Sequence, residues 1–186
     1  MIDYRKIADA VDHYTGCGYK YIEVPWIISL DSLLITRPPG ARIFSTFAGE
    51  LVASGEQSFL EMRKEFQPGK YQCVTPCFRD EKVHDELHKQ YFLKNELIWV
   101  PEREAIHNIS LVDFVDMIVG DAFRFFGQYG LAKIIDNPLD NAFYNKDILI
   151  NDIEVGSYGL RAYDGFTWVY GTGCAEPRLS QTLKKE

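Results

Sequence analysis

Apolar and polar positions repeat with two different periods along the chain, and each period predicts one kind of element. Residues 3–15 carry apolar side chains at helical spacing and predict a helix, with Asp3 placed as its cap. Residues 18–28 are rich in β-branched and aromatic side chains and predict a strand. Pro25 interrupts that strand, and because proline donates no ladder hydrogen bond, it should lie at a strand end, a sheet edge or a subunit interface.

Three further segments have similarly clear patterns. Residues 36–45 contain a Pro-Pro-Gly run and predict a loop. Residues 51–66 predict a strand end, a turn and a helix, with Glu56 at or just before the helix start. Glu56 either favours the helix dipole or points into a pocket to receive a ligand ammonium. Residues 101–130 predict the longest helix, packed on a sheet and ended by glycine.

Residues 77–97 predict two antiparallel strands, 77–81 and 92–96, joined by a polar connection too long for a tight hairpin turn. The side chains that share a face through strand alternation are Arg79 and Glu81 in the first strand, and Phe92, Lys94 and Glu96 in the second. Cations, an aromatic ring and carboxylates make a poor hydrophobic core. This face is therefore either an ordinary solvated hairpin or the floor of a site for a phosphorylated, ring-bearing ligand.

Charged residues and glycines also mark the last forty residues. Residues 146–163 predict strands in which alternation places Asp152 and Glu154 on one face, either for a divalent cation or for solvent. An apolar strand then runs into the small residues Gly171, Gly173 and Ala175, which permit close approach by a ligand or another backbone. A helix follows with Pro177 in its first turn. Arg178 at that helix start predicts an anion site.

Composition limits the class of protein. A chain of 186 residues predicts a single domain spanning 1–186, and no apolar run is long enough to cross a bilayer. The four cysteines show no disulfide-like pattern, so we expect a reduced, cytoplasmic protein, with a zinc site at Cys73 and Cys77 as the weaker alternative. The net charge of −7 argues against binding nucleic acid through a broad basic surface, although it allows a local basic groove.

Five segments, in order along the chain, resemble the catalytic core of class II aminoacyl-tRNA synthetases. They are GYKYIEVPWI (motif 1), SGEQ at 54–57 (the loop whose glutamate receives the substrate amino group in the seryl, threonyl and prolyl branch), FRDE with FLKNE (motif 2), IEVGSYGLR at 153–161 (the strand whose glutamate holds metal and ATP) and GTGCAEPR (motif 3). Each motif is loose alone, whereas five in order over nearly the whole chain are specific.

The resemblance implies an α+β fold, an antiparallel sheet flanked by helices, with homodimerisation through residues 1–28 and with ATP and Mg²⁺ bound over the sheet. It also implies roles for individual residues. ATP would be bound by Arg79, Glu81, His88, Phe92, Glu154, Gly171, Gly173 and Arg178, of which Arg79 and Arg178 are the catalytic arginines; the amino acid by Glu56 and Arg79; and the metal by Glu154 and Asp152.

The function implied is that of an ATP-dependent ligase that forms an aminoacyl-adenylate and transfers the amino acid to tRNA or another acceptor. The alternatives are an inactive paralogue that binds amino acid or nucleotide and regulates a partner, and a dimeric structural protein without a ligand. Ala175 replaces the third glycine of motif 3, and Pro177 precedes Arg178. The sequence ends soon after Arg178, which predicts a core without an anticodon-binding domain. The Glu56 loop and the FxKxE ending of motif 2 favour a small or polar amino acid.

Overall fold

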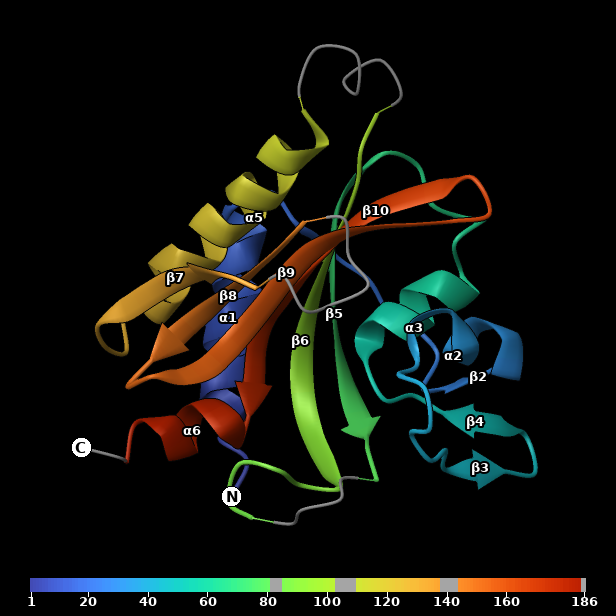
Figure 1. Cartoon of the computed structure of the whole chain (residues 1–186), viewed down its shortest axis with the longest axis horizontal. Helices are drawn as coiled ribbons and strands as arrows, with labels where there is room; N and C mark the ends of the chain where they lie inside the picture. The colour runs from blue at the N-terminus through green and yellow to red at the C-terminus, as the bar shows by residue number, and fades with distance from the viewer. Residues whose placement is uncertain (81–84, 103–109, 138–143, 185–186) are drawn as a thin grey trace.

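A seven-stranded sheet forms the centre of the molecule in the computed structural model, which describes residues 1–80, 85–102, 110–137 and 144–184 (Figure 1). In sheet order its strands are β1 (Lys20–Tyr21), β5 (Gly69–Phe78), β6 (Tyr91–Val100), β10 (Phe166–Glu176), β9 (Ile153–Tyr163), β8 (Asn145–Ile150) and β7 (Ala132–Asp136). Only β1 pairs in parallel, with β5; every other pairing in this sheet is antiparallel. The predicted α+β fold with an antiparallel sheet flanked by helices is confirmed.

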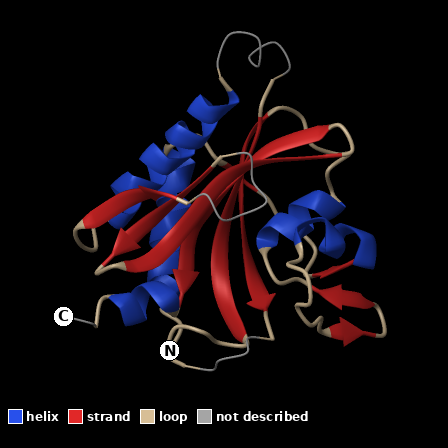
Figure 2. Cartoon of the chain, viewed as in Figure 1, coloured by secondary structure: helices blue, strands red, loops and turns tan. Residues whose placement is uncertain are grey.

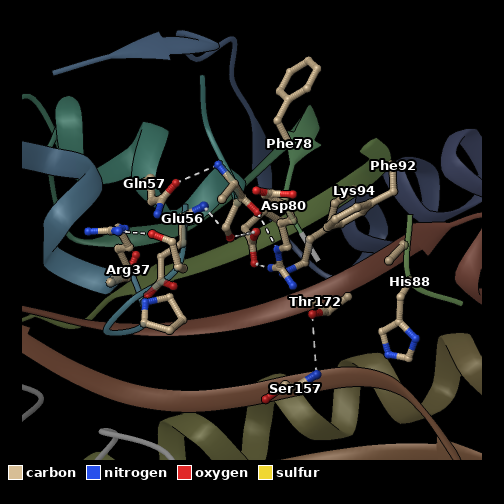
Figure 3. A pocket seen from close by; sticks show the side chains of 18 of the residues that line it. Arg37, Glu56, Gln57, Phe78, Asp80, His88, Phe92, Lys94, Ser157 and Thr172 are labelled. Atoms are coloured by element: carbon tan, nitrogen blue, oxygen red, sulfur yellow. Dashed lines mark hydrogen bonds and ion pairs between the residues drawn. The ribbon is translucent and has the colours of Figure 1, made fainter. Parts of the chain in front are cut away.

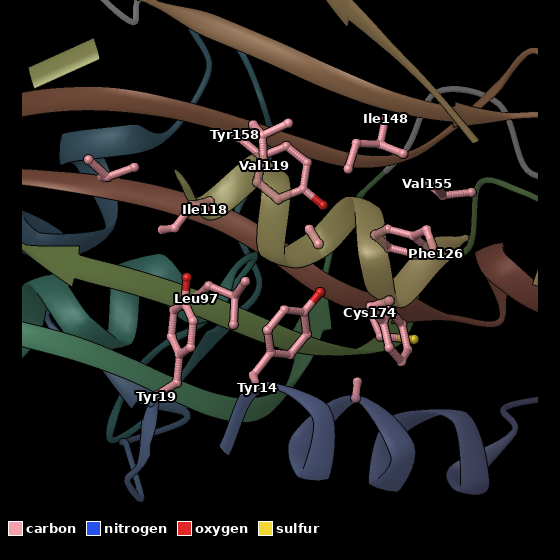
Figure 4. Packing of buried hydrophobic residues seen from close by; sticks show 14 of the residues in the cluster. Tyr14, Tyr19, Leu97, Ile118, Val119, Phe126, Ile148, Val155, Tyr158 and Cys174 are labelled. Carbon is pink, nitrogen blue, oxygen red and sulfur yellow. The ribbon is translucent and has the colours of Figure 1, made fainter. Parts of the chain in front are cut away.

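Helices cover the two faces of the sheet unequally. The long helices α1 (Tyr4–Gly16) and α5 (Leu111–Phe126) pack against one face, and the short α3 (Gly55–Glu61) packs against β5 and β6 on the other. Strand alternation explains both contacts, because Leu97 points into the cluster under α1 and α5 (Figure 4) while its neighbour Ile98 points to Phe59 of α3. The free part of the second face is where a ligand could bind.

The helix ends follow ordinary capping chemistry. Asp3 caps α1 as predicted, since its carboxylate accepts a hydrogen bond from the Arg5 amide. Helix α5 begins after Ser110, which forms a capping box with Asp113, and it ends before Gly127. The first described turn of this helix therefore lies later than the predicted start at residue 101, and residues 103–109 lie outside the described ranges. None of the helices in the described ranges has the length and apolar content needed to cross a membrane.

A second, smaller sheet lies beside the first (Figure 2) and consists of β2 (Ile27–Ile28), β4 (Gly49–Leu51) and β3 (Ser45–Thr46). Helix α2 (Leu30–Thr36) packs against α3 next to it. The single strand predicted for residues 18–28 is therefore wrong. The last backbone hydrogen bond to β5 comes from the Ile22 amide; the chain then passes Pro25 and pairs in the other sheet, where β2 begins at Ile27.

Two hairpins differ in length from the prediction. In the β5–β6 pair, Cys77 lies opposite Phe92 and the ladder extends back to Gly69, so both strands are about twice as long as the pattern suggested. Arg79 follows the end of β5 rather than lying within a strand. In the β8–β9 hairpin the chain turns at Asn151 and Asp152, both of which have positive φ. Asp152 is thus a turn residue.

Candidate functional site

A cavity of about 1020 Å³ opens on the face of the sheet that α1 and α5 leave free. Its walls come from the end of β5, from β6, β9 and β10, from the start of α3, and from the loop 37–44 that follows α2. Among the described residues that line it, seven are arginine or lysine and four are aspartate or glutamate. A cationic cavity in a chain of net charge −7 indicates an anionic ligand.

Internal ion pairs neutralise part of this charge. Lys94 Nζ lies 2.8 Å from Glu96 Oε1, and Arg161 Nη1 lies 2.6 Å from Glu56 Oε2. Arg42 pairs with Asp80 at the cavity wall. In the described part of the chain, the cations that line the cavity without a carboxylate partner are Arg37, Arg79, Lys89 and Arg178. Glu154 is the one lining carboxylate left without such a pair in the same ranges.

Arg79 is held by the backbone on both sides. Its Nε donates to the Ala53 carbonyl at 3.0 Å, and its amide donates to the carbonyl of Gln90 at 2.8 Å. The guanidinium carbon lies 5.0 Å from the centre of the Phe92 ring. These contacts direct the remaining guanidinium N–H groups toward the cavity, where they can bind a phosphate or a carboxylate with two-pronged geometry.

Arg178 enters the same cavity from the opposite end of the sequence. It starts the short helix α6 (Arg178–Thr182), directly after β10 and a cis peptide bond between Glu176 and Pro177. Its Nε is buried without a hydrogen-bond partner. Because a buried donor without an acceptor is costly, this atom indicates a binding partner that comes from outside the chain.

Phe92 and His88 lie on the same side of the cavity, away from Glu56 (Figure 3). Phe92 is half-buried on β6 and presents an aromatic ring to the cavity. His88 is half-buried, and its Nδ1 lies 2.9 Å from Asp85 Oδ1, a contact that lowers the pKa of Asp85 to about 2. Glu81, which was also expected to bind ATP, lies outside the described residues.

Glu56 lies at the base of the cavity and is only 4% exposed. Its Oε2 accepts a hydrogen bond from Arg161, and its Oε1 accepts one from the Trp168 indole at 2.7 Å. Burial raises the pKa of this carboxyl, and the charge of Arg161 acts in the opposite direction. Ser54 caps the helix start and also donates to Glu96 at 2.6 Å, so the Glu56 loop is tied to β6.

Gly55 explains how that loop comes so close to the sheet. A Cβ at this position would lie 2.9 Å from the Cβ of Glu96 and 3.0 Å from the hydroxyl of Thr75. Only glycine, which has no Cβ, allows the first residue of α3 to pack this closely against β5 and β6. The sequence signal for Glu56, a Ser-Gly-Glu turn before a helix, thus corresponds to a tightly fitted element whose glutamate lines the cavity.

The two carboxylates expected to bind metal are not together. Glu154 lines the cavity at the start of β9, whereas Asp152 is exposed in the β8–β9 turn and pairs with Lys133 at 2.9 Å. Strand alternation predicted a shared face because the turn between the two strands was missed. The described residues contain no group of three or more His, Cys, Asp or Glu side chains that could hold a metal ion on their own. Glu154 alone fits the way Mg²⁺ binds with phosphates, through one or two carboxylates and several waters.

Gly171 and Gly173 serve packing on the other side of the sheet. A Cβ on Gly171 would lie 2.6 Å from the Tyr158 ring, and one on Gly173 would lie 1.9 Å from the amide oxygen of Asn95. Both residues are inside β10 and neither lines the cavity, although Thr172 between them does. Their missing side chains make room for core aromatics such as Tyr14, whose hydroxyl donates to the Gly173 carbonyl at 3.0 Å.

The sequence did not predict that two further arginines, Arg161 and Arg37, would line the cavity. Arg161 lies on β9 with its guanidinium carbon 4.0 Å from the centre of the Tyr170 ring. A charged residue in the mostly apolar second half of this strand was the available signal. Arg37 follows α2 in the Pro-Pro-Gly loop and lines the cavity opposite the sheet. No sequence pattern marks Arg37, because its place depends on how the loop folds back.

Known proteins resemble this chain in sequence and in fold. No protein-family model matches it. A serine–tRNA ligase of Legionella pneumophila, seen in several strains, is 28% identical over 116 residues, covering 52% of this chain and 27% of the ligase. This chain therefore spans about a quarter of the length of the curated relatives that it matches.

Solved structures resemble the chain over nearly its whole length. A pyrrolysyl-tRNA synthetase of Desulfitobacterium hafniense superposes with a TM-score of 0.73 at 13% identity, over 97% of this chain and 68% of the other. A cytoplasmic serine–tRNA ligase of Naegleria fowleri, solved with AMP, gives a TM-score of 0.74 at 16% identity, over 94% and 51%. The chain has the fold of class II aminoacyl-tRNA synthetase catalytic cores, as its motifs predict.

Proposed function

We propose that this protein activates an amino acid with ATP, forming an aminoacyl-adenylate and pyrophosphate, for transfer to tRNA or another acceptor. The main support is the pair Arg79 and Arg178. They come from positions about a hundred residues apart, line one cavity, and have no carboxylate partner among the described residues. Two such arginines in one cavity fit a ligand with several negative charges, and the fold is that of enzymes named for amino acid and tRNA ligation.

The proposed reaction needs positioning and charge neutralisation more than acid–base chemistry. An oxygen of the amino acid carboxylate, already ionised at neutral pH, attacks the α-phosphorus of ATP, and the bond from that phosphorus to the β-phosphate bridging oxygen breaks. Pyrophosphate leaves with the bonding electrons. No proton has to move, so two fixed guanidinium groups can provide much of the catalysis by holding the reacting groups in line and stabilising the developing charge.

Six residues that line the cavity have a proposed role in that reaction. Arg79 binds the α-phosphate and the substrate carboxylate, and Arg178 binds the γ-phosphate. Phe92 stacks on adenine, and His88 contacts the outer phosphates. Mg²⁺, held by Glu154 together with the phosphates, would supply additional neutralisation of their charge. Glu56 receives the substrate ammonium; two of its lone pairs remain available after the bonds from Arg161 and Trp168.

The test is amino-acid-dependent exchange of radioactive pyrophosphate into ATP, measured for each of the twenty amino acids. We expect exchange with at least one amino acid and its loss in Arg79→Ala and Arg178→Ala variants. Because Arg178 is proposed to contact only ATP, its variant should weaken ATP binding, while the Arg79 variant should weaken both substrates. ATP binding without exchange for any amino acid would refute the proposal and favour a paralogue that binds nucleotide and regulates a partner.

We also propose that the chain forms a homodimer through its 1–28 region. The side chains of Trp26 and Ile27 are 56% and 41% exposed, and both line a shallow apolar depression with Pro25 and Phe78. Phe78 also lines the large cavity, so a partner seated there would stiffen one wall of the site. Light scattering after size exclusion tests this proposal, and a strict monomer at micromolar concentration would contradict it.

A further inference from the structure

Of the unpaired cations that line the cavity in the described ranges, the proposed ATP site leaves Lys89 and Arg37 unused, and Lys89 is exposed whereas Arg37 is half-buried. Arg37 follows α2, and Gln57 of α3 donates to the Leu33 carbonyl of α2 at 3.3 Å, so α2 and the Glu56 helix are tied together. Figure 3 accordingly shows Arg37 on the side of Glu56 and Gln57, across the pocket from Phe92 and His88. Arg37 therefore lies at the amino acid end of the cavity rather than at the adenine end.

The guanidinium of Arg37 has an unsatisfied donor. One terminal nitrogen, Nη2, donates to the Ala41 carbonyl and so holds the loop, whereas Nε is buried and has no hydrogen-bond partner. No carboxylate of the described residues pairs with this arginine. Among the arginines that line the cavity, the ones with a buried, unsatisfied Nε in the described ranges are Arg178 and Arg37. The γ-phosphate of ATP is the proposed acceptor for Arg178. Arg37 requires a different acceptor.

The charge of the neighbouring groups indicates what that acceptor is. Glu56 is already neutralised by Arg161 at 2.6 Å, and Glu96 by Lys94 at 2.8 Å. Adding a substrate ammonium to this neutral cluster, beside the cation of Arg37, would leave two positive charges without a counter-ion at this end of the cavity, where Glu56 and the Nε of Arg37 are buried. A buried site tolerates this poorly unless the same substrate brings a second negative charge.

We propose that the activated amino acid carries an acidic side chain, which Arg37 binds. This inference rests on the proposed function. The substrate would then be held at three points: its reacting carboxylate by Arg79, its ammonium by Glu56, and its side-chain carboxylate by Arg37. The planar guanidinium fork matches a carboxylate, and the uncharged amide of asparagine or glutamine offers only one acceptor oxygen and no charge. The expectation of a small or polar amino acid is thereby narrowed to aspartate or glutamate.

Pyrophosphate exchange with matched substrates tests this inference. We expect aspartate or glutamate to support exchange with a kcat/KM at least about 10-fold above that of its own amide, and above that of serine and alanine, because an ionised acceptor strengthens the bond to Arg37. Exchange with neutral amino acids but not with acidic ones would overturn the inference and leave the proposed function standing. Absence of exchange with every amino acid would overturn both.

A pair of variants links the preference to Arg37 itself. In Arg37→Gln we expect kcat/KM for the acidic substrate to fall about 10- to 100-fold, while KM for ATP stays unchanged, since a single charge-assisted hydrogen-bond pair is lost. Arg63→Gln is the matched control, because Arg63 caps the Leu60 carbonyl outside the cavity. Circular dichroism checks the fold of both variants. An acidic-substrate kcat/KM that survives in a folded Arg37→Gln variant would overturn the inference.

Discussion

Replacing Arg161 with methionine tests how the buried carboxylate of Glu56 is kept ionised. The substitution keeps a long side chain over Tyr170 but removes the counter-ion 2.6 Å from Glu56 Oε2. Burial raises the pKa of Glu56 above 4.5 in the folded chain, and the Arg161 charge limits that rise. Without Arg161 the pKa should rise further, because desolvation then acts with less opposition.

The sign of the pH dependence follows from this raised pKa. A group whose pKa is higher in the folded state contributes stability that is fully present below its unfolded pKa, 4.5 here, and is lost as pH rises through the folded pKa. In the Arg161→Met variant the loss therefore continues to higher pH than in the natural chain. Each pH unit is worth about 1.4 kcal/mol, so the three units from the unfolded pKa to about pH 7.5 limit the total to about 4 kcal/mol.

In the natural chain, ionisation of the buried Glu56 already lowers the unfolding free energy by part of these about 4 kcal/mol. The variant should therefore be less stable than the natural chain by about 2–4 kcal/mol at neutral pH, close to the usual effect of breaking a buried ion pair. The assay is urea denaturation of both proteins at several pH values between about 4.5 and 8. The difference in unfolding free energy should be small at the acidic end and should grow with pH. Adding Glu56→Gln to the variant should remove most of the pH dependence, since the buried charge is gone.

A stability difference that does not change with pH would refute this account of Glu56. It would mean that Arg161 acts through packing on Tyr170 alone, and that Glu56 keeps its charge by other contacts. The double variant distinguishes these cases even if Arg161→Met folds poorly, because Glu56→Gln/Arg161→Met retains no buried unpaired charge.

Three further predictions concern the site, the proposed dimer and the Glu56 loop. Phe92→Ala should raise KM for ATP about 5- to 100-fold through lost base stacking, while Phe92→Tyr stays near the natural value in steady-state kinetics. Trp26→Asp should shift the proposed dimer to monomer, with a dissociation constant raised at least about 30-fold by sedimentation, if this exposed aromatic anchors the interface. Gly55→Ala should lower the unfolding free energy by about 1–3 kcal/mol in urea, because its methyl group would crowd Glu96; an unchanged midpoint would show that α3 can shift away from the sheet.

Local patterns in the sequence were enough for the framework and for part of the site. Period-two alternation marks the β5–β6 hairpin, and helical spacing marks α1 with its Asp3 cap. Glu56 was found because a Ser-Gly-Glu turn before a helix is a local signal. Arg79 and Arg178 were identified because they lie in the short motifs FRDE and GTGCAEPR, and both line the cavity. In each case the signal lies in the near neighbours of the residue in the sequence.

Other features depended on pairing between distant segments, and the tertiary structure alone decided them. The turn at Asn151 and Asp152 separates Asp152 from Glu154, because pairing between β8 and β9 reverses the chain there. Gly171 and Gly173 resemble a ligand-binding loop in sequence. In the structure, the space beside them is filled by Tyr158, Tyr14 and Asn95 from other elements.

The charge balance of the cavity is the clearest case of a property that exists only in three dimensions. Arg161 neutralises Glu56 across 105 positions of sequence, and Arg37 reaches the same end of the cavity through the packing of α2 on α3. A sequence shows which charges a chain carries, and here it identified the fold and the likeness to ligases. Which charges cancel depends on distances of a few ångströms between distant residues, because unscreened electrostatic energy in a buried site falls off with separation in space and not along the chain.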